Sequence, residues 1–130
     1  MTEITNKNNY DLEDRTLEFS KKVIFLVKKL SKDTINFKLT DQLVRSSTSV
    51  GANYREANDA ISKKDFLHRM RISRKEARET TYWLELILEA NPEFTKEGDF
   101  LLKECKELRN ILSAILTKSE KQNDNKRNNK

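Results

Sequence analysis

Residues 45–56 read "RSSTSVGANYRE" and are the most informative segment of this 130-residue chain. Four consecutive Ser and Thr residues with a glycine close behind are typical of a loop, because these residue types lower helix propensity. The segment nevertheless keeps the three- and four-residue spacing of a helix, at Leu39, Leu43, Ser47, Val50, Tyr54, Ala57 and Ile61. We therefore predict a helix whose small side chains let a bulky neighbour, such as Tyr82, Trp83 or an aromatic residue of a neighbouring subunit, approach closely; a weak, partly frayed helix is the alternative.

The composition around this segment favours long helices. Charged residues make up 36% of the chain, and two Gly and one Pro are too few for the turns of a multi-stranded sheet. A net charge of +5 permits an acidic partner such as nucleic acid but is weak evidence alone. The single cysteine, Cys105, and the lack of an apolar signal or membrane-spanning run lead us to expect a cytoplasmic protein with no membrane association.

The apolar spacing predicts four helices and an all-α, antiparallel, up-down four-helix bundle. Ser62 and Asp65 form a capping box at the start of the third helix, and the "NP" at residues 91–92 ends it. Its buried seam is Phe66, Met70, Ser73, Ala77, Thr80, Leu84 and Ile87, and the seam of the fourth helix is Leu101, Cys105, Leu108, Leu112 and Ile115. The predicted helices span residues 11–30, from 38–41 to 57–60, 62–90 and 95–118, so that 1–10 is a flexible N-terminus, 11–118 the bundle domain and 119–130 a disordered basic tail.

The segments "RSSTSVGANYREA" (45–57) and "KKDFLHRMRISRKEARETTYWLELI" (63–87) resemble a family of bacterial four-helix-bundle proteins encoded by intervening sequences inside 23S rRNA genes. The accessory protein of diversity-generating retroelements shares that fold. The likeness covers residues 11–116, and one departure is Ala57, where the family usually has glycine. The matching residues are Arg45, Ser46, Ser47, Ser49, Val50, Asn53, Glu56, Ser62, Asp65, Phe66, Glu76, Ala77, Glu79, Thr80, Trp83 and Leu84.

The resemblance implies a homo-oligomer, a ring of five bundles around a central channel. It also implies that part of the motif has a structural or oligomer-forming role: Arg45, Ser46, Ser47, Ser49, Asn53, Glu56, Glu76, Glu79 and Trp83. From the spacing we expect Arg45 to pair with Glu76 or Glu79, across helices or across subunits, because a buried charge needs a partner. A metal site is not expected, since a di-iron bundle needs two Glu-x-x-His pairs and His68 is the only histidine.

Opposite the seam, the third helix carries a cationic row at a 4-3-4-3 spacing. The predicted nucleic-acid-binding residues are this row and the flanking Arg74, namely Lys64, His68, Arg71, Arg74, Lys75 and Arg78. The row ends at Tyr82, Glu85 and Glu89. A solvated helix face is the alternative interpretation. No aromatic stacking platform or base-reading motif is apparent, so any binding should follow the phosphate backbone with little sequence selectivity.

Two functional hypotheses follow. The first is an oligomer that binds RNA or DNA through the third helix. The second is an interaction scaffold for a protein partner, such as a reverse-transcriptase-like polymerase, with the basic face on an acidic surface. We expect no enzymatic activity and no cofactor, because the sequence has no phosphate-binding glycine loop, no Cys/His metal cluster and no nucleophile with a histidine base.

Overall fold

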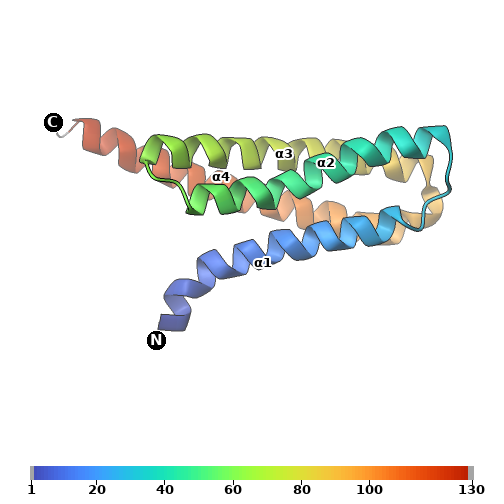
Figure 1. Cartoon of the computed structure of the whole chain (residues 1–130), viewed down its shortest axis with the longest axis horizontal. Coiled ribbons are helices and arrows are strands. Elements are labelled where there is room, and N and C mark those ends of the chain that lie inside the picture. Colours follow the sequence, from blue (N-terminus) through green and yellow to red (C-terminus); the bar gives the residue numbers. More distant parts are fainter. Residues whose placement is uncertain (1, 129–130) are drawn as a thin grey trace.

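The structure is a computed structural model that describes the backbone of residues 2–128 and the side chains of residues 12–125. Four long helices follow one another along the chain, and Figure 1 shows them stacked side by side. A short 3-10 turn, η1, separates the last two. The bounds are α1 Thr2–Val27, α2 Thr34–Asn58, α3 Lys63–Ala90, η1 Pro92–Phe94 and α4 Thr95–Asn128. The prediction of an all-α chain with four helices is confirmed, and the described residues include no strand.

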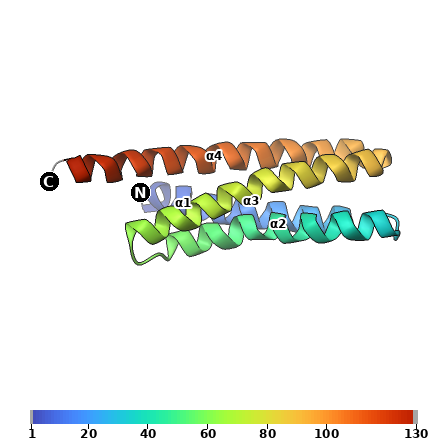
Figure 2. The same ribbon diagram turned by 90° about the horizontal axis from the view of Figure 1, so that it is seen from above.

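Successive helices in Figure 1 run in opposite directions along the long axis of the molecule. Figure 2, turned by 90°, shows α3 between α2 and α4, with α1 behind them. The closest pairing is between α2 and α3, whereas α1 and α4 share the smallest interface of any two helices that pack together. The segment that looked like a loop in the sequence therefore lies in the most extensive helix–helix interface of the fold.

One core runs the length of the bundle, and the predicted seams lie in it. Met70, Ser73, Ala77, Thr80, Leu84 and Ile87 of α3 are buried, whereas Phe66 is half-buried. The fourth-helix seam is buried except at the half-buried Ile115. The largest fully buried side chains are Tyr54, Phe19, Leu26, Leu43, Met70, Leu84, Ile87, Leu101, Leu108, Leu112, Leu116 and Val23.

Local hydrogen bonds fix where the helices begin and end. Ser62 caps α3 as predicted, with its hydroxyl accepting from the Asp65 amide at 3.0 Å. Asp33 caps α2 in the same way, accepting from the Asn36 amide at 2.8 Å. The Asn36 side chain then exchanges two buried hydrogen bonds, of 3.0 and 2.8 Å, with Asn91. This amide pair ties the start of α2 to the end of α3.

Several predicted helix ends were wrong. α2 begins at Thr34 rather than at 38–41, because Asp33 provides a cap that the sequence interpretation overlooked. α1 ends at Val27 rather than at residue 30, and it begins at Thr2, so most of the predicted flexible segment 1–10 has helical backbone. Ile61 lies between α2 and α3 and is 99% exposed, so it does not continue the buried face.

The predicted disordered tail is also corrected over its described part, because α4 continues without a break to Asn128. Ser119 is buried, and the Glu120 carboxylate forms an ion pair with Arg71 of α3 at 2.9 Å. After Gly98, α4 contains neither Gly nor Pro, so nothing in the backbone interrupts the helix there. The prediction of disorder rested on the lack of apolar residues and did not consider these contacts.

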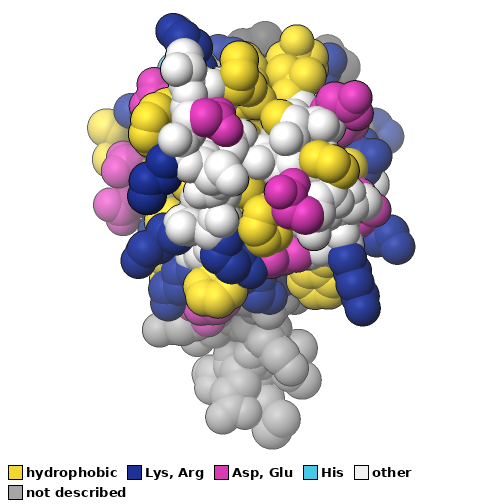
Figure 3. Space-filling model, turned by 90° about the vertical axis from the view of Figure 1, so that its right-hand side faces the viewer, with side chains coloured by type: hydrophobic (Ala, Val, Ile, Leu, Met, Phe, Trp, Pro, Cys, Tyr) yellow, Lys and Arg dark blue, Asp and Glu magenta, His cyan; other side chains and the backbone are white. Residues whose placement is uncertain are grey.

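The surface combines charged groups with isolated apolar ones. Figure 3 views the end of the molecule that carries the connection between α1 and α2, and hydrophobic side chains there are separated by Lys, Arg, Asp and Glu. Among the described helices, none has the length and apolarity that crossing a lipid bilayer requires.

Candidate nucleic-acid interface

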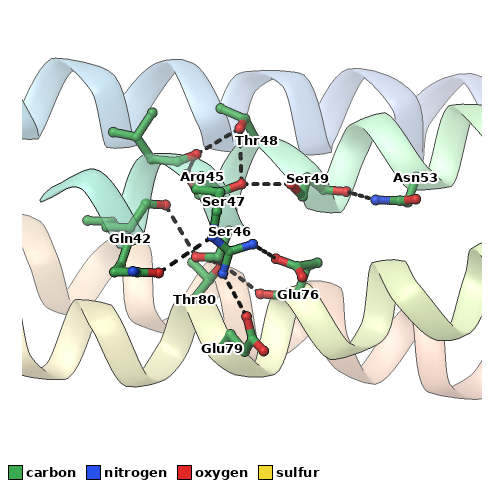
Figure 4. Close-up of polar contacts among 12 residues, drawn as sticks. Gln42, Arg45, Ser46, Ser47, Thr48, Ser49, Asn53, Glu76, Glu79 and Thr80 are labelled. Carbon is green, nitrogen blue, oxygen red and sulfur yellow. Dashed lines mark hydrogen bonds and ion pairs between the residues drawn. The ribbon is translucent and has the colours of Figure 1, made fainter. Parts of the chain in front are cut away.

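Arg45 joins α2 to α3 through two carboxylates. Its Nη1 donates to Glu76 Oε2 at 3.1 Å and its Nη2 to Glu79 Oε2 at 2.9 Å, as Figure 4 shows. The Glu76 side chain is only 7% exposed, so its charge needs this partner. The hydrogen bond with Glu79 raises the pKa of Arg45 above its ordinary value. The predicted pairing is confirmed, with both glutamates engaged and all three residues in one chain.

Hydroxyl groups also join residues 45–56 of α2 to both neighbouring helices. Ser73 of α3 donates to the Val50 carbonyl at 2.7 Å, and the Thr80 hydroxyl lies 2.9 Å from that of Ser46. From the other side, Ser20 of α1 donates to the Ser47 carbonyl at 3.1 Å. Small side chains therefore let α2 approach both neighbouring helices closely enough for hydroxyl groups to bond to its backbone.

Gly51 lies where α1 packs tightly against α2. A methyl group built on this glycine would lie 2.8 Å from the Thr16 Oγ1 and 3.0 Å from the Thr16 Cβ. Thr16 is fully buried, and its hydroxyl donates within α1 to backbone carbonyls. The close packing predicted for the segment is thus present, although the neighbours are Thr16, Ser20, Ser73 and Thr80 rather than large aromatic side chains.

The other motif residues serve different purposes. Asn53 donates to the Ser49 carbonyl at 2.9 Å and accepts from Arg69 of α3 at 3.4 Å. Ser49 donates to the Arg45 carbonyl at 2.7 Å within α2. Glu56 is exposed and forms no ion pair within the described part of the chain. Five motif positions, Arg45, Ser46, Ser47, Glu76 and Glu79, therefore belong to the internal network, and Glu56 does not.

The predicted basic residues lie along the outer face of α3. Lys64, His68, Arg71, Lys75 and Arg78 are all exposed, and Arg74 is half-buried. Arg71 is neutralised in part by Glu120 of α4. Lys75 and Arg78 form no ion pair with any described residue. The two halves of the row therefore differ: Lys64 and Arg71 lie beside Glu120 and Asp124 of α4, whereas Lys75 and Arg78 lie on the side of α3 that faces α2.

Two hollows border this basic face. The first, of about 380 Å³, lies between α3 and the end of α4 and is lined by Lys64, Leu67, Arg71, Glu120, Asn123 and Asp124. The second, of about 550 Å³, lies between α2 and α3 and is lined by Gln42, Arg45, Lys75, Arg78, Glu79, Tyr82 and Trp83. We call the second the α2–α3 hollow. It contains Lys75 and Arg78, neither of which forms an ion pair with a described side chain, together with the Arg45–Glu79 ion pair.

Tyr82, at which the basic row ends in the sequence, lines the α2–α3 hollow. It follows Arg78 by four residues, and so extends the 4-3-4-3 spacing of the basic row, and its side chain is 57% exposed. The Tyr82 ring meets the Trp83 ring edge to face, with centroids 5.0 Å apart and planes at 76°. An exposed aromatic ring that contacts a second ring therefore lies beside Lys75 and Arg78.

Neither Cys105 nor the acidic residues indicate a catalytic or metal centre. Burial raises the pKa of the Cys105 thiol to about 12, and its sulfur donates to the Ala77 carbonyl at 3.3 Å. Within the part of the chain that the structure describes, no three His, Cys, Asp or Glu side chains lie close enough to hold a metal ion together.

The fold and this interface define a helical bundle whose second and third helices are joined by paired charges and buried hydroxyl groups. The sequence model of the 23S rRNA-intervening sequence protein family matches residues 8–114, and the chain belongs to that family. Its structure is similar to the crystal structure of a protein of unknown function from the S23 ribosomal protein family of Bacteroides thetaiotaomicron. The two share 34% sequence identity with a TM-score of 0.76, over 84% of this chain and 97% of that chain. A search of curated proteins found no significant match.

Proposed function

We propose that this chain is a non-enzymatic protein of the bacterial cytoplasm, an up-down bundle that assembles into a ring-like homo-oligomer and binds RNA or DNA through α3. The supporting observation is the exposed row Lys64, His68, Arg71, Lys75 and Arg78 on one face of one helix. Of the lysines and arginines in this row, Arg71 forms an ion pair with Glu120, whereas Lys64, Lys75 and Arg78 form none with a described side chain. A phosphate that binds Lys75 or Arg78 therefore does not have to displace a carboxylate.

The binding expected of such a row is electrostatic. From Lys64 to Arg78 the helix rises about 21 Å, so the row can contact several successive phosphates. Each contact releases counterions from the nucleic acid, and the affinity therefore falls steeply as salt is added. Repetition of the row around an oligomer would multiply the number of phosphates that one assembly contacts.

Charge reversal tests this proposal. Replacing Arg71, Lys75 and Arg78 by Glu should abolish retention of a labelled RNA or DNA in fluorescence polarisation at low salt, with helicity by circular dichroism unchanged. The matched control replaces the exposed Lys28, Lys32 and Lys38 by Glu, which alters the net charge equally but away from α3. Equal losses in both variants would mean that overall charge, and not this face, drives binding. Unchanged retention in the α3 variant would reject the proposal.

Self-association is supported by apolar side chains that the described chain leaves in contact with solvent. Phe25 and Phe100 are 64% and 62% exposed on α1 and α4, and Ile35 and Phe37 are exposed at the start of α2. An oligomer interface would cover such groups. Light scattering should give a mass several times that of one chain, with five copies as the expected ring; a monomer at all concentrations would contradict this part of the proposal.

A protein-binding scaffold is the second candidate function. Lys22, Phe25, Glu97, Phe100 and Leu101 line an apolar notch of about 150 Å³ between α1 and α4, and the Lys22 ammonium lies 5.4 Å from the Phe100 ring centroid. An acidic, polymerase-like partner could place an apolar side chain there. The absorbance of the purified protein distinguishes the two functions, because bound nucleic acid raises the absorbance at 260 nm relative to 280 nm.

A further inference from the structure

The α2–α3 hollow has cationic side chains at one end and an aromatic side chain at the other, as a nucleotide has a phosphate and a base. Lys75, Arg78 and Tyr82 follow one another at three- and four-residue intervals, so they lie on the same face of α3. Tyr82 lies about 6 Å further along the helix axis than Arg78. The hollow that they share, about 550 Å³, falls within the size range of small-molecule sites.

We infer that this hollow binds one unpaired nucleotide of a single-stranded nucleic acid. Tyr82 stacks on the base, and Lys75 and Arg78 hold the adjoining phosphate. The inference rests on the proposed function and deepens it, because a purely electrostatic row would bind single strands and duplexes alike. In a duplex each base is already stacked on its neighbours, so no base face is available to stack on Tyr82.

The aromatic partner is already oriented for this role. Tyr82 is more than half exposed, yet its contact with the half-buried Trp83 ring limits how far it can turn. A ring that is held in place loses less conformational entropy when a base stacks on it. Stacking of this kind contributes about 1–3 kcal/mol per base.

The charges in the hollow place the phosphate on one side. Arg45 is occupied by Glu76 and Glu79, so it is not available to a ligand. The Glu79 carboxylate also repels an anion that approaches the α2 wall. Lys75 and Arg78 have no such acidic partner among the described side chains. The phosphate therefore binds at these two residues on α3.

The test compares a labelled oligonucleotide as a single strand and as a duplex of the same sequence, using fluorescence polarisation with the full chain. Tyr82→Ala should weaken single-strand binding about tenfold or more and change duplex binding by less than about twofold. Tyr82→Phe keeps the stacking ring and should bind like the unmodified protein. Trp83 is the only tryptophan, so its emission should also change when the single strand binds.

Each other outcome overturns the inference in a recognisable way. If Tyr82→Ala leaves single-strand binding intact while the Arg71, Lys75 and Arg78 reversal abolishes it, the electrostatic proposal stands and the nucleotide site is wrong. If the unmodified protein binds neither form, both fail. If Tyr82→Ala lowers the mass in light scattering, or if only an acidic peptide changes the Trp83 emission, the hollow receives a protein surface instead.

Discussion

Arg45 of α2 lies 3.1 Å from Glu76 of α3, and the glutamate is buried while the arginine is half exposed. The pair is therefore asymmetric: the arginine can be solvated by water if the contact breaks, but the glutamate cannot. Removing the arginine should harm the fold more than neutralising the glutamate, because only the first change leaves an unpaired charge in a poorly solvated place.

Arg45→Ala should consequently lower the free energy of unfolding by about 1–3 kcal/mol, a value reduced from that of a fully buried pair because Arg45 is half exposed. Adding Glu76→Gln to that variant should restore part of the loss. Urea unfolding followed by circular dichroism measures both. If Arg45→Ala lowers the free energy of unfolding equally with and without Glu76→Gln, the two residues are not coupled as the distance suggests.

Gly51→Ala should destabilise the protein although alanine is the better helix former. The gain in helix propensity is about 1 kcal/mol, but the added methyl group meets the buried Thr16, and such overpacking costs about 1–3 kcal/mol. The neighbouring Ala52 is exposed, so Ala52→Gly measures propensity alone. Thermal unfolding of the two variants separates packing from propensity. A stabilising Gly51→Ala change would show that α1 and α2 are not in close contact there.

Stability should fall as the pH rises above about 9, in part because of Cys105. The pKa of its thiol is about 12 when folded and 9.0 at its ordinary value, so between these values the unfolded chain loses the proton that the folded chain retains. The loss is about 1.4 kcal/mol per pH unit for this group. The Cys105→Ala variant has no thiol to titrate, so its stability does not fall for this reason. The difference in unfolding free energy between the two proteins should therefore narrow as the pH rises above about 9. A difference that is independent of pH would contradict the assignment.

Glu120→Gln should strengthen nucleic-acid binding, on the proposal that α3 is the binding face. Glu120 pairs with Arg71, and both side chains are partly exposed, so the expected gain in affinity is roughly twofold to fivefold. Glu107→Gln removes the same charge from α4 where it faces Arg15 instead. An equal gain in both variants, measured by fluorescence polarisation, would show that the effect is one of net charge.

The helix spacing predicted the interior well because burial follows periodicity. The α3 seam consists of residues three or four apart, and Glu76 and Glu79, the two partners of Arg45, are three apart. A rigid helix converts that spacing directly into a shared face. Ser46 was predicted to lie in a closely packed interface and Ser73 to lie in the buried seam. Their bonds to Thr80 and to the Val50 carbonyl follow from that proximity.

The ends of helices and the contacts of the surface were harder to predict. Ile61 has the spacing of a core residue but lies past the end of α2, where spacing no longer determines direction. The extension of α4 depends on contacts such as Glu120 with Arg71, which join residues 49 apart. Among these surface residues, Tyr82 differs, because its position at the end of the basic row follows from the helical spacing alone.

The small interface between α1 and α4 has a consequence for how the molecule opens. Its ion pair, Arg15 with Glu104, and the pair that Lys29, just after α1, forms with Glu97 of α4 are both reached by water, whereas the hydroxyl bonds of α2 with α3 are sealed from it. Dissolved ions screen the former and leave the latter unchanged. Backbone amides of α1 should therefore exchange with deuterium faster than those of α2 and α3. The difference in exchange rate should increase as the ionic strength rises.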